Sequence, residues 1–383
     1  RHCLAFWRQV SSAGRGCNVG RDCLPKAGTT SAAGRWLPIL LIFFGAALSA
    51  IFSSDASVSF GILKSWFFAP IIFGLLLLNL VRTKEQFKLI LAAILFSAVA
   101  VSLVGVYYLA AGRLTFDGRL TAFYLSPNQL AMYLAPSLIL AVFFWFEAAR
   151  RWEKLLLFAV YCLLFVILYF TYSYGAWLAI LAALGCAAIV FRRAEAFSKR
   201  NLHLVFCLLI FAAMLMILLQ MRSVKFINLL SADRSSLQSR FMVWQSALAI
   251  LKDHWFLGVG PGMFQHYYLA YQKYFAAPYL EWAAPQPHNL FLAFWLQTGL
   301  LGLAGFLLLI FNFFRGKRAL WRKSKQPLIL ALAAVMIYFL AHGLVDTPFW
   351  KNDLSLVFFT IVFLGHKASR LFVDEEKAVF LGR

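Results

Sequence analysis

Long apolar segments alternate with short polar connections along most of the chain. About ten segments approach the roughly 20 apolar residues that an α-helix needs to cross a bilayer. They cover residues 36–52, 60–81, 87–110, 128–146, 155–171, 173–191, 203–221, 289–314, 327–345 and 354–370. The pattern predicts an all-α, polytopic transmembrane protein whose longest polar connection, residues 222–288, forms one large loop.

Residues 1–35 do not follow this pattern. They are rich in Gly, Ser, Cys and Arg and contain no apolar run long enough to span a bilayer. We interpret them as a disordered tail, a fragment edge or a misassigned start. The expected organisation is this N-terminal segment, a membrane domain over residues 36–371 and a cytoplasmic tail over residues 372–383.

Composition supports the membrane class and the charge pattern gives an orientation. The chain is 62% hydrophobic and 13% charged, with a mean hydropathy of +0.77. The net charge of +21 comes from basic clusters at residues 82–88, 150–154, 192–200 and 315–325, between apolar segments. Such clusters mark cytoplasmic connections, so we expect membrane lipids rather than nucleic acid as partners. The loop 222–288 and the shorter loop 111–127 are then extracytoplasmic.

The large loop contains a predicted amphipathic helix over residues 234–252. Its apolar stripe repeats at helical spacing and consists of Leu237, Phe241, Trp244, Leu248 and Leu251. We expect this helix to lie in the membrane interface. Arg240 falls about 60° from Leu237 around the helix. Its guanidinium can reach the phosphate of a lipid-linked diphosphate, although spacing alone favours contact with anionic lipid.

Two further features follow in the loop. Gly258-Val-Gly-Pro-Gly262 predicts a turn, because Met263 stands where a dinucleotide-binding motif needs a third glycine. His288 immediately precedes Asn289, which can cap the next helix. A histidine at this position is a candidate general base or a solvated interfacial side chain. The carboxylates nearest to it in the sequence are Asp253 and Glu281.

Other polar residues lie near the same side of the membrane. Lys64 is in the second apolar segment near its outer end, and Arg113 and Arg119 are in a loop where charge is scarce. His342 and Asp346 are four residues apart and are expected to form a structural pair. The sequence contains no HExxH, Walker or GxSxG motif and no cluster of metal ligands. We therefore expect no metal and no other cofactor.

Several stretches together resemble the O-antigen ligase and O-antigen polymerase family of bacterial membrane glycan transferases. They are Arg119-Leu-Thr-Ala-Phe-Tyr-Leu-Ser-Pro-Asn128, Arg240-Phe-Met-Val-Trp244, Asp253-His-Trp-Phe-Leu-Gly-Val-Gly-Pro-Gly-Met-Phe264, and His288-Asn289 followed by Gln297-Thr-Gly-Leu300. The resemblance covers roughly residues 49–371. It implies a fold of the GT-C type in the bacterial inner membrane, with an undecaprenyl-diphosphate-linked glycan as donor and a glycan or lipid as acceptor.

The resemblance also implies roles for individual residues. Arg240 would steady the diphosphate and His288 would activate the acceptor hydroxyl in a metal-independent, inverting transfer. Lys64, Arg113 and Arg119 would assist at the diphosphate. The family usually shows Ser-Arg-Gly where this chain has Ser173-Tyr174-Gly175, so one expected arginine is replaced by Tyr174.

The expected function is therefore O-antigen ligase-like transfer at the outer face of the membrane. The alternatives are a polymerase of O-antigen or exopolysaccharide from the same family, an exporter of the lipid-linked glycan, and an inactive relative. An exporter predicts polar residues lining several helices at mid-membrane, which the sequence lacks. Tyr174 is the residue that favours an inactive relative.

Overall fold

The computed structural model describes residues 32–193, 218, 220–221, 226–227, 236–271, 283–324 and 326–372. The chain divides into two units, Arg1–Leu37 and Pro38–Arg383. Most of the first unit, nearly all of the predicted span 203–221 and the tail 373–383 lie outside the described residues. Within the described ranges the regular structure is helical throughout, which confirms the predicted all-α class.

The helices of the described ranges follow the apolar segments closely. They are α2 (Ala32–Ile51), α3 (Ala56–Ile62), a π-helical turn (Leu63–Phe68), α4 (Ala69–Leu80), α5 (Lys84–Ala110), α6 (Pro127–Glu147), α7 (Arg151–Tyr169), α8 (Tyr174–Arg193), α11 (Ser236–Asp253), α12 (Phe264–Tyr271), α13 (Leu290–Ser324), α14 (Pro327–His342) and α15 (Asn352–Leu371).

Five stretches are long and apolar enough to cross a membrane: Ala56–Leu80, Lys84–Ala110, Pro127–Glu147, Arg151–Tyr169 and Leu290–Arg318. Shorter apolar helices occur at Trp36–Ile51, Tyr174–Val190 and Pro327–His342. These findings confirm a polytopic membrane protein.

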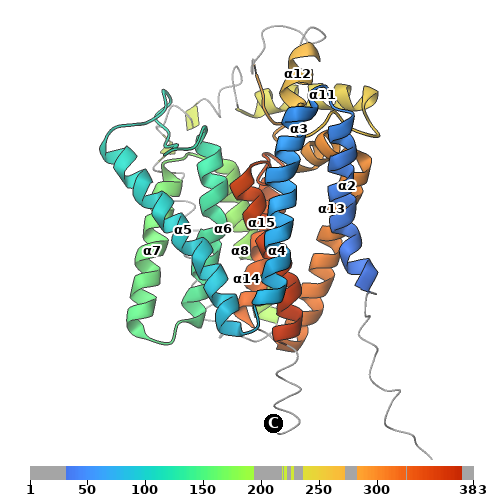
Figure 1. Ribbon diagram of the computed structural model, residues 1–383. Helices are drawn as coiled ribbons and strands as arrows, with labels where there is room; N and C mark the ends of the chain where they lie inside the picture. Colours follow the sequence, from blue (N-terminus) through green and yellow to red (C-terminus); the bar gives the residue numbers. More distant parts are fainter. Residues whose placement is uncertain are drawn as a thin grey trace, which may run out of the picture. The chain divides into compact units, whose positions relative to one another are not determined.

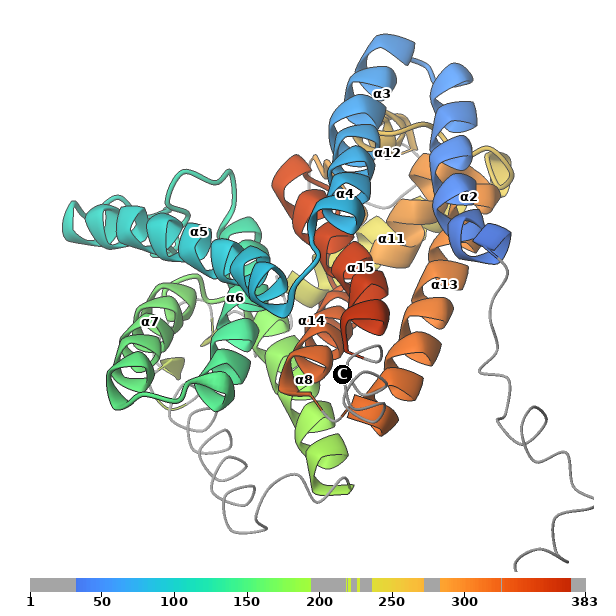
Figure 2. The ribbon, with the colours of Figure 1, turned by 60° about the horizontal axis from the view of Figure 1, so that its bottom comes forward.

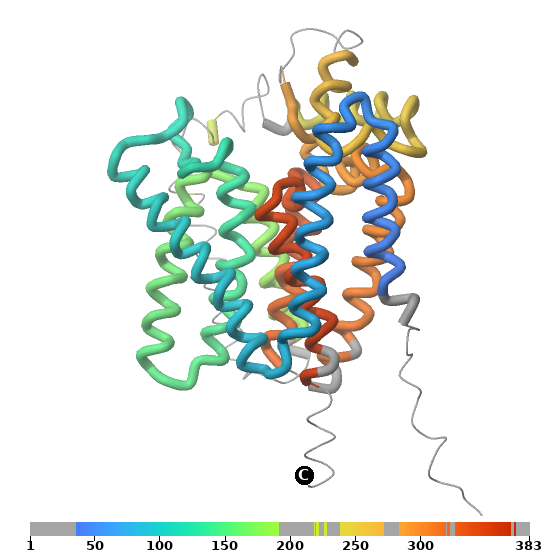
Figure 3. Tube along the Cα trace, viewed as in Figure 1, coloured from blue at the N-terminus to red at the C-terminus, as the bar shows by residue number. Residues whose placement is uncertain are grey.

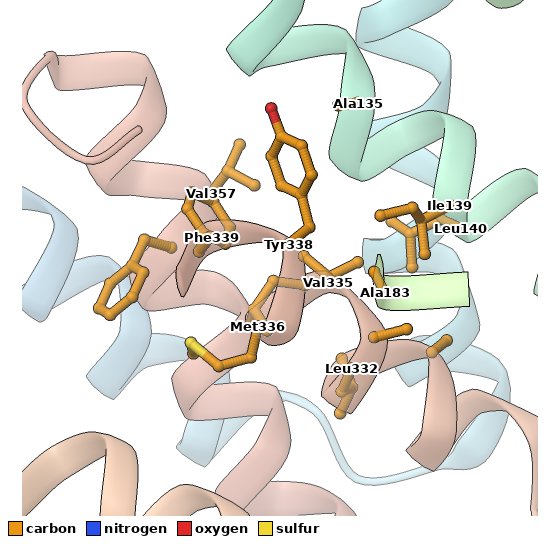
Figure 4. Close-up of a cluster of buried hydrophobic side chains, with 14 of the residues drawn as sticks. Ala135, Ile139, Leu140, Ala183, Leu332, Val335, Met336, Tyr338, Phe339 and Val357 are labelled. Carbon is orange, nitrogen blue, oxygen red and sulfur yellow. The ribbon is translucent and has the colours of Figure 1, made fainter. Parts of the chain in front are cut away.

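Helix α14 forms the centre of the second unit. It packs against α6, α8, α13 and α15, and nearly all of its residues are buried. Figure 4 shows Tyr338, Met336 and Phe339 of α14 among Ile139 of α6 and Val357 of α15. Because α14 is apolar nearly all round, it has no polar face to direct toward water and can lie at the centre of the bundle.

Two groups of helices pack beside α14 and α15. Helices α5, α6 and α7 contact one another, while α4 packs along α15. Figure 2 shows α5, α6 and α7 together on one side of α14, and α4 beside α15. Gly74 allows α4 to approach closely, because a Cβ atom there would overlap the ring of Phe363. The group of α5, α6 and α7 carries one wall of the candidate site described below.

A π-helical turn interrupts the second apolar segment between α3 and α4. Phe67 is fully buried there and contacts Phe349 and Trp350, with ring centroids 5.4 and 5.7 Å away. Trp66 also lies edge-on to Trp350, at 6.1 Å. The extra residue of a π turn shifts which side chains face the bundle. These aromatic contacts hold the connection between α14 and α15 in place.

The connections fall at two ends of the helices, as the alternation in the sequence predicts. Figures 1 and 3 show α11 and α12 at the same end as the α2–α3, α5–α6 and α14–α15 connections. The α4–α5 and α6–α7 connections lie at the opposite end. Residues far apart in the sequence therefore meet at the end that carries α11.

Helix α13 covers the predicted segment 289–314, but it bends at Gly299, where φ is +66°. The backbone N–H of Leu300 donates to Phe256 O at 2.9 Å, and Val259 N–H donates to Leu296 O at 2.6 Å. A Cβ atom at position 299 would lie 2.5 Å from Phe256 O. The bend therefore forms where the segment after α11 docks into α13.

The predicted glycine turn is confirmed and has a structural role. Gly258, Gly260 and Gly262 all have positive φ, which glycine adopts at little cost. Gly262 N–H donates to Gln297 Oε1 at 2.7 Å, and Ser59 Oγ donates to Pro261 O at 2.9 Å. The turn thus ties the bend of α13 to α3.

The amphipathic helix of the large loop is also confirmed, as α11, but its buried face differs from the predicted stripe. Val243, Ala247 and Ile250 are buried in a small core that includes Phe264 and Tyr268 of α12. Of the predicted stripe, Leu251 is also buried in this core, whereas Phe241 and Leu248 are about half exposed, at 52% and 50%. Val243 and Ile250 each stand next to a residue of the predicted stripe in the sequence, so the apolar pattern alone did not separate the two faces. Location of α11 in the membrane interface stays a prediction.

Candidate active site

A buried carboxylate, Asp346, lies in the connection between α14 and α15 and is 2% exposed. One of its oxygens, Oδ1, lies 3.2 Å from His288 Nδ1 and accepts from the backbone N–H of Thr347 at 2.9 Å. The other, Oδ2, accepts from Asn128 Nδ2 at 3.1 Å and lies 3.7 Å from Arg240 Nη2. Each oxygen therefore faces one backbone or amide donor and one basic side chain.

The charges around Asp346 favour its ionised form. Burial alone would raise the pKa of this carboxyl. That effect is outweighed by His288, through its charge and its hydrogen bond, and by the nearby Arg240 and His342, so the pKa of Asp346 is lowered. A carboxylate that stays ionised can hold a cation and a histidine in fixed positions.

His288 is positioned by its backbone as well as by Asp346. Its φ is +46°, and its carbonyl oxygen accepts from Trp244 Nε1 at 3.2 Å. The next residue, Asn289, caps α13 as predicted, because its Oδ1 accepts from the backbone N–H groups of Phe291 and Leu292. Because Nδ1 faces Asp346, Nε2 is the ring nitrogen left for another partner. The His288 side chain is 26% exposed.

Two arginines flank the carboxylate. Arg240 comes from α11 and its side chain is 16% exposed. Arg119 comes from the α5–α6 connection and donates from Nη2 to Asn128 Oδ1 at 2.7 Å and from Nε to Thr171 O at 2.8 Å. Asn128 therefore bridges Arg119 to Asp346. We refer to Asp346, His288, Arg240, Asn128 and Arg119 as the Asp346 cluster.

Arg119 remains a cation in this setting. Burial lowers its pKa from the usual value, and Arg240 lowers it further, while Asp117, Asp346 and Tyr174 act in the opposite sense. An arginine side chain is so basic that such a shift leaves it charged. The Asp346 cluster therefore holds two guanidinium groups beside one buried carboxylate.

Strained backbone gathers in the same connections. Ala122, Tyr172 and His288 are the non-glycine residues with positive φ in the described part of the chain. Ala122 lies between α5 and α6, Tyr172 between α7 and α8, and His288 just before α13. Such conformations cost energy and concentrate at functional sites. The strain agrees with a site formed where these connections meet.

Residues 159–307 match a family model described as O-antigen ligase. This region belongs to the O-antigen ligase family. No curated protein matches the chain. The family indicates membrane glycan transfer of the ligase or polymerase type. The matched O-antigen ligase region includes Arg240 and His288, whereas Asp346, Asn128 and Arg119 lie outside it and join it only in the fold.

The fold leaves two of the predicted diphosphate-binding residues outside the Asp346 cluster. Arg113 is exposed and lies over the rings of Tyr107 and Tyr108, at 5.5 and 5.7 Å from their centroids. Lys64 is exposed in the π-helical turn. Among the described residues, neither side chain forms a hydrogen bond or ion pair with Asp346, Arg240 or His288.

His342 has a different neighbour from the one expected. Its Nδ1 pairs with Tyr338 OH at 2.7 Å, while its carbonyl oxygen accepts from the backbone N–H of Asp346. Its Nε2 lies close to α8, because a Cβ atom at Gly175 would be 3.3 Å away. The two side chains influence each other electrostatically, but the described hydrogen bonds of the Asp346 carboxylate go to other residues. His342 thus supports the backbone of Asp346 rather than its carboxylate.

The partner of His288 was the main feature that the sequence did not reveal. Asp253, one of the two nearest carboxylates in the sequence, hydrogen-bonds to Tyr271 OH, and Glu281 lies outside the described residues. Asp346 is 58 residues from His288 in the chain. Its place at the end of an apolar segment was the available signal. No group of three or more His, Cys, Asp or Glu that could hold a metal occurs in the described ranges.

Proposed function

We propose that this protein transfers a glycan from an undecaprenyl-diphosphate-linked donor to an acceptor hydroxyl at the outer face of the bacterial cytoplasmic membrane. The single observation that carries the proposal is the position of Asp346 between His288 and Arg240. It brings a base and a cation from different elements to one place. Family membership supports glycan transfer in general.

Arg240 and Arg119 suit the diphosphate leaving group. A guanidinium has five N–H donors, and the contact with Asp346 occupies one end of Arg240. Its remaining donors can bind phosphate oxygens in the bidentate manner that arginine favours. Positive charge held in place before the reaction stabilises the negative charge that develops as the bond from the sugar to the diphosphate breaks.

His288 suits the acceptor. Contact between its Nδ1 and Asp346 favours the tautomer with the proton on Nδ1, which leaves Nε2 free to accept a proton. As the acceptor oxygen bonds to the anomeric carbon, its proton passes to Nε2 and the lipid diphosphate departs with the electron pair of the broken bond. The resulting imidazolium is stabilised by Asp346.

The position of Arg119 supports an active protein, even though Tyr174 stands where the family pattern has an arginine. Tyr174 offers one neutral donor where the family pattern has a guanidinium fork. Arg119 is close enough to both Tyr174 and Asp346 for each to influence its pKa. We therefore assign to Arg119 the charge that Tyr174 does not supply. An exporter has less support, because the buried residues of the central helix α14 are mostly apolar.

Membrane orientation follows from charge. The α4–α5 and α6–α7 connections contain Arg82 and Arg150, and Lys84 and Arg151 begin the helices that follow them. Both connections lie opposite the end that carries α11 (Figure 1). The positive-inside rule then makes the Asp346 cluster extracytoplasmic.

The test is transfer by purified protein in nanodiscs from its lipid-linked donor. His288→Ala and Arg240→Ala should each lower the rate by on the order of 10²-fold or more. His266→Ala and Lys252→Ala are matched controls, because both side chains are exposed in the same loop region, and they should leave the rate unchanged. Near-native transfer by both site variants would refute the mechanism. In a deletion strain, loss of attachment with donor accumulation indicates a ligase, and attachment of single repeats indicates a polymerase.

A further inference from the structure

A second group of polar side chains adjoins the Asp346 cluster. Tyr124 OH donates to Asp353 Oδ2 at 2.9 Å, and Lys351 Nζ lies 4.4 Å from the centre of the Tyr124 ring. Lys351 Nζ also donates to Gln129 Oε1 at 3.4 Å. Burial and the charge of Asp353 raise the pKa of Tyr124, so its phenol keeps its proton. The group thus combines an ammonium, a carboxylate, an amide and a phenol.

Both groups take side chains from the same two parts of the chain, one around the start of α6 and the other between α14 and the start of α15. Gln129 follows Asn128, which contacts Asp346, and Lys351 lies in the α14–α15 connection with Asp346. The second group is therefore next to the proposed reacting centre without being part of it.

An aromatic ring, Phe123, covers this group on one side. It stacks on Tyr124 with ring centroids 4.8 Å apart and planes inclined by 24°. Phe123 is nevertheless 57% exposed. Because one face of the ring lies against Tyr124, the exposed area includes the opposite face. A flat apolar surface is thereby presented at the edge of a polar group.

The backbone holds this ring in place at a cost. Ala122, directly before Phe123, has φ of +49° although it is not glycine, and it is 3% exposed. The backbone N–H of Tyr124 donates to Thr121 O at 3.0 Å, which closes a tight turn around Ala122. A strained turn that presents an exposed ring is more consistent with binding than with packing.

The Lys351 ammonium has more N–H groups than its described contacts use. Its described contacts are a ring and one amide oxygen, and its ammonium carries three N–H donors. No carboxylate lies within ion-pair distance of it among the described salt bridges. It can therefore donate to a hydroxyl or acidic group of a ligand.

We propose that Phe123, Lys351, Asp353 and Gln129 form a subsite for a sugar ring of the transferred or accepting glycan. The C–H face of a pyranose packs on an aromatic ring, while its hydroxyls require donors and acceptors at the edge of that ring. Phe123 supplies the ring, Lys351 a donor, and Asp353 and Gln129 supply acceptors. This proposal rests on the glycan transfer proposed above and adds where a sugar is recognised.

The competing explanation is that Phe123 only anchors the α5–α6 connection in the lipid. Phe116 and Leu125 in the same connection are 105% and 90% exposed. Phe116 therefore provides a matched control, because it is an exposed phenylalanine from the same connection. If lipid contact is the only role of Phe123, the two rings should behave alike.

The experiment uses the full-length protein in nanodiscs and, as probe, the free oligosaccharide released by mild acid from the lipid-linked donor of the host strain. Binding is measured by calorimetry in the His288→Ala background, which removes turnover. We expect Phe123→Ala and Lys351→Met each to weaken binding roughly tenfold, the size of one lost stacking contact or charged hydrogen bond. Phe123→Trp should keep binding, because it keeps an aromatic face, and Phe116→Ala should leave it unchanged.

Transfer measurements in the native background identify the source of the sugar. A higher KM for the lipid-linked donor alone assigns the subsite to the donor glycan, and a higher KM for the acceptor alone assigns it to the acceptor. Unchanged binding in both Phe123→Ala and Lys351→Met overturns the subsite, as does an equal loss in Phe116→Ala. If the native chain binds the oligosaccharide with these effects but transfers nothing, the proposed function fails and the subsite stands.

Discussion

Replacing Asp346 by asparagine tests the centre of the site with almost no change in shape. In the native protein all partners of the carboxylate present hydrogen-bond donors: His288 and Thr347 to Oδ1, and Asn128 and Arg240 to Oδ2. An asparagine has one acceptor and one donor end, so one pair of partners must face its NH₂ group. The substitution also removes the negative charge between two basic side chains.

The expected magnitude follows from this geometry. The Arg240 and His288 side chains are 16% and 26% exposed, so solvent compensates only partly for the lost carboxylate. Loss of one partner from a buried ion pair costs about 3 kcal/mol of unfolding free energy. Loss of the acidic partner of a catalytic histidine lowers turnover by on the order of 10²–10⁴-fold. We expect Asp346→Asn to reduce both stability and transfer by these amounts.

The assay compares thermal unfolding in detergent and transfer in nanodiscs for native protein, Asp346→Asn and the control Asp253→Asn. Asp253 bonds to Tyr271 at an exposed position, so its substitution should change stability by less than about 0.5 kcal/mol. Because the folded-state pKa of Asp346 is lowered, its stabilisation is present above the unfolded pKa of about 4 and is lost as pH falls further. The stability difference should therefore be constant near neutral pH and shrink in acid. A folded Asp346→Asn protein with transfer within threefold of native would refute this account of the site.

Three further predictions concern charge, orientation and the bend of α13. Arg119→Ala should lower transfer by on the order of 10²-fold, and Tyr174→Arg in that variant should restore part of it, as measured with purified donor; a silent Arg119→Ala would end the compensation hypothesis. A cysteine at the exposed Gln245, in a background without native cysteines, should react with an impermeant thiol reagent in cells with a permeabilised outer membrane; reaction only after inner-membrane lysis would reverse the topology. Gly299→Ala should destabilise the protein by more than about 2 kcal/mol in thermal unfolding, because φ is positive and the new Cβ would crowd Phe256 O; an unchanged melting temperature would contradict this.

The helices could be predicted because their signal is local. A segment of about 20 apolar residues has few alternatives to a membrane helix, since its backbone must satisfy its own hydrogen bonds in lipid. The predicted segment 87–110 is α5, and 128–146 is α6. The glycine turn and the cap at Asn289 were equally readable, because each depends on residues adjacent in the sequence. The family resemblance, which rested on short motifs of this kind, agrees with the match over residues 159–307.

The sequence by itself therefore determined the helical class, the membrane character and the two residues Arg240 and His288 as candidates. Only the tertiary structure showed that Asp346, Asn128 and Arg119 lie in one cluster with these two residues. It also showed that Arg113 and Lys64 lie outside that cluster. The bend at Gly299 and the buried face of α11 were also decided there. The physical reason is that these features depend on contacts between distant segments. Periodicity reports which face of a helix is apolar, but it does not report which carboxylate from another connection will meet a given cation or histidine.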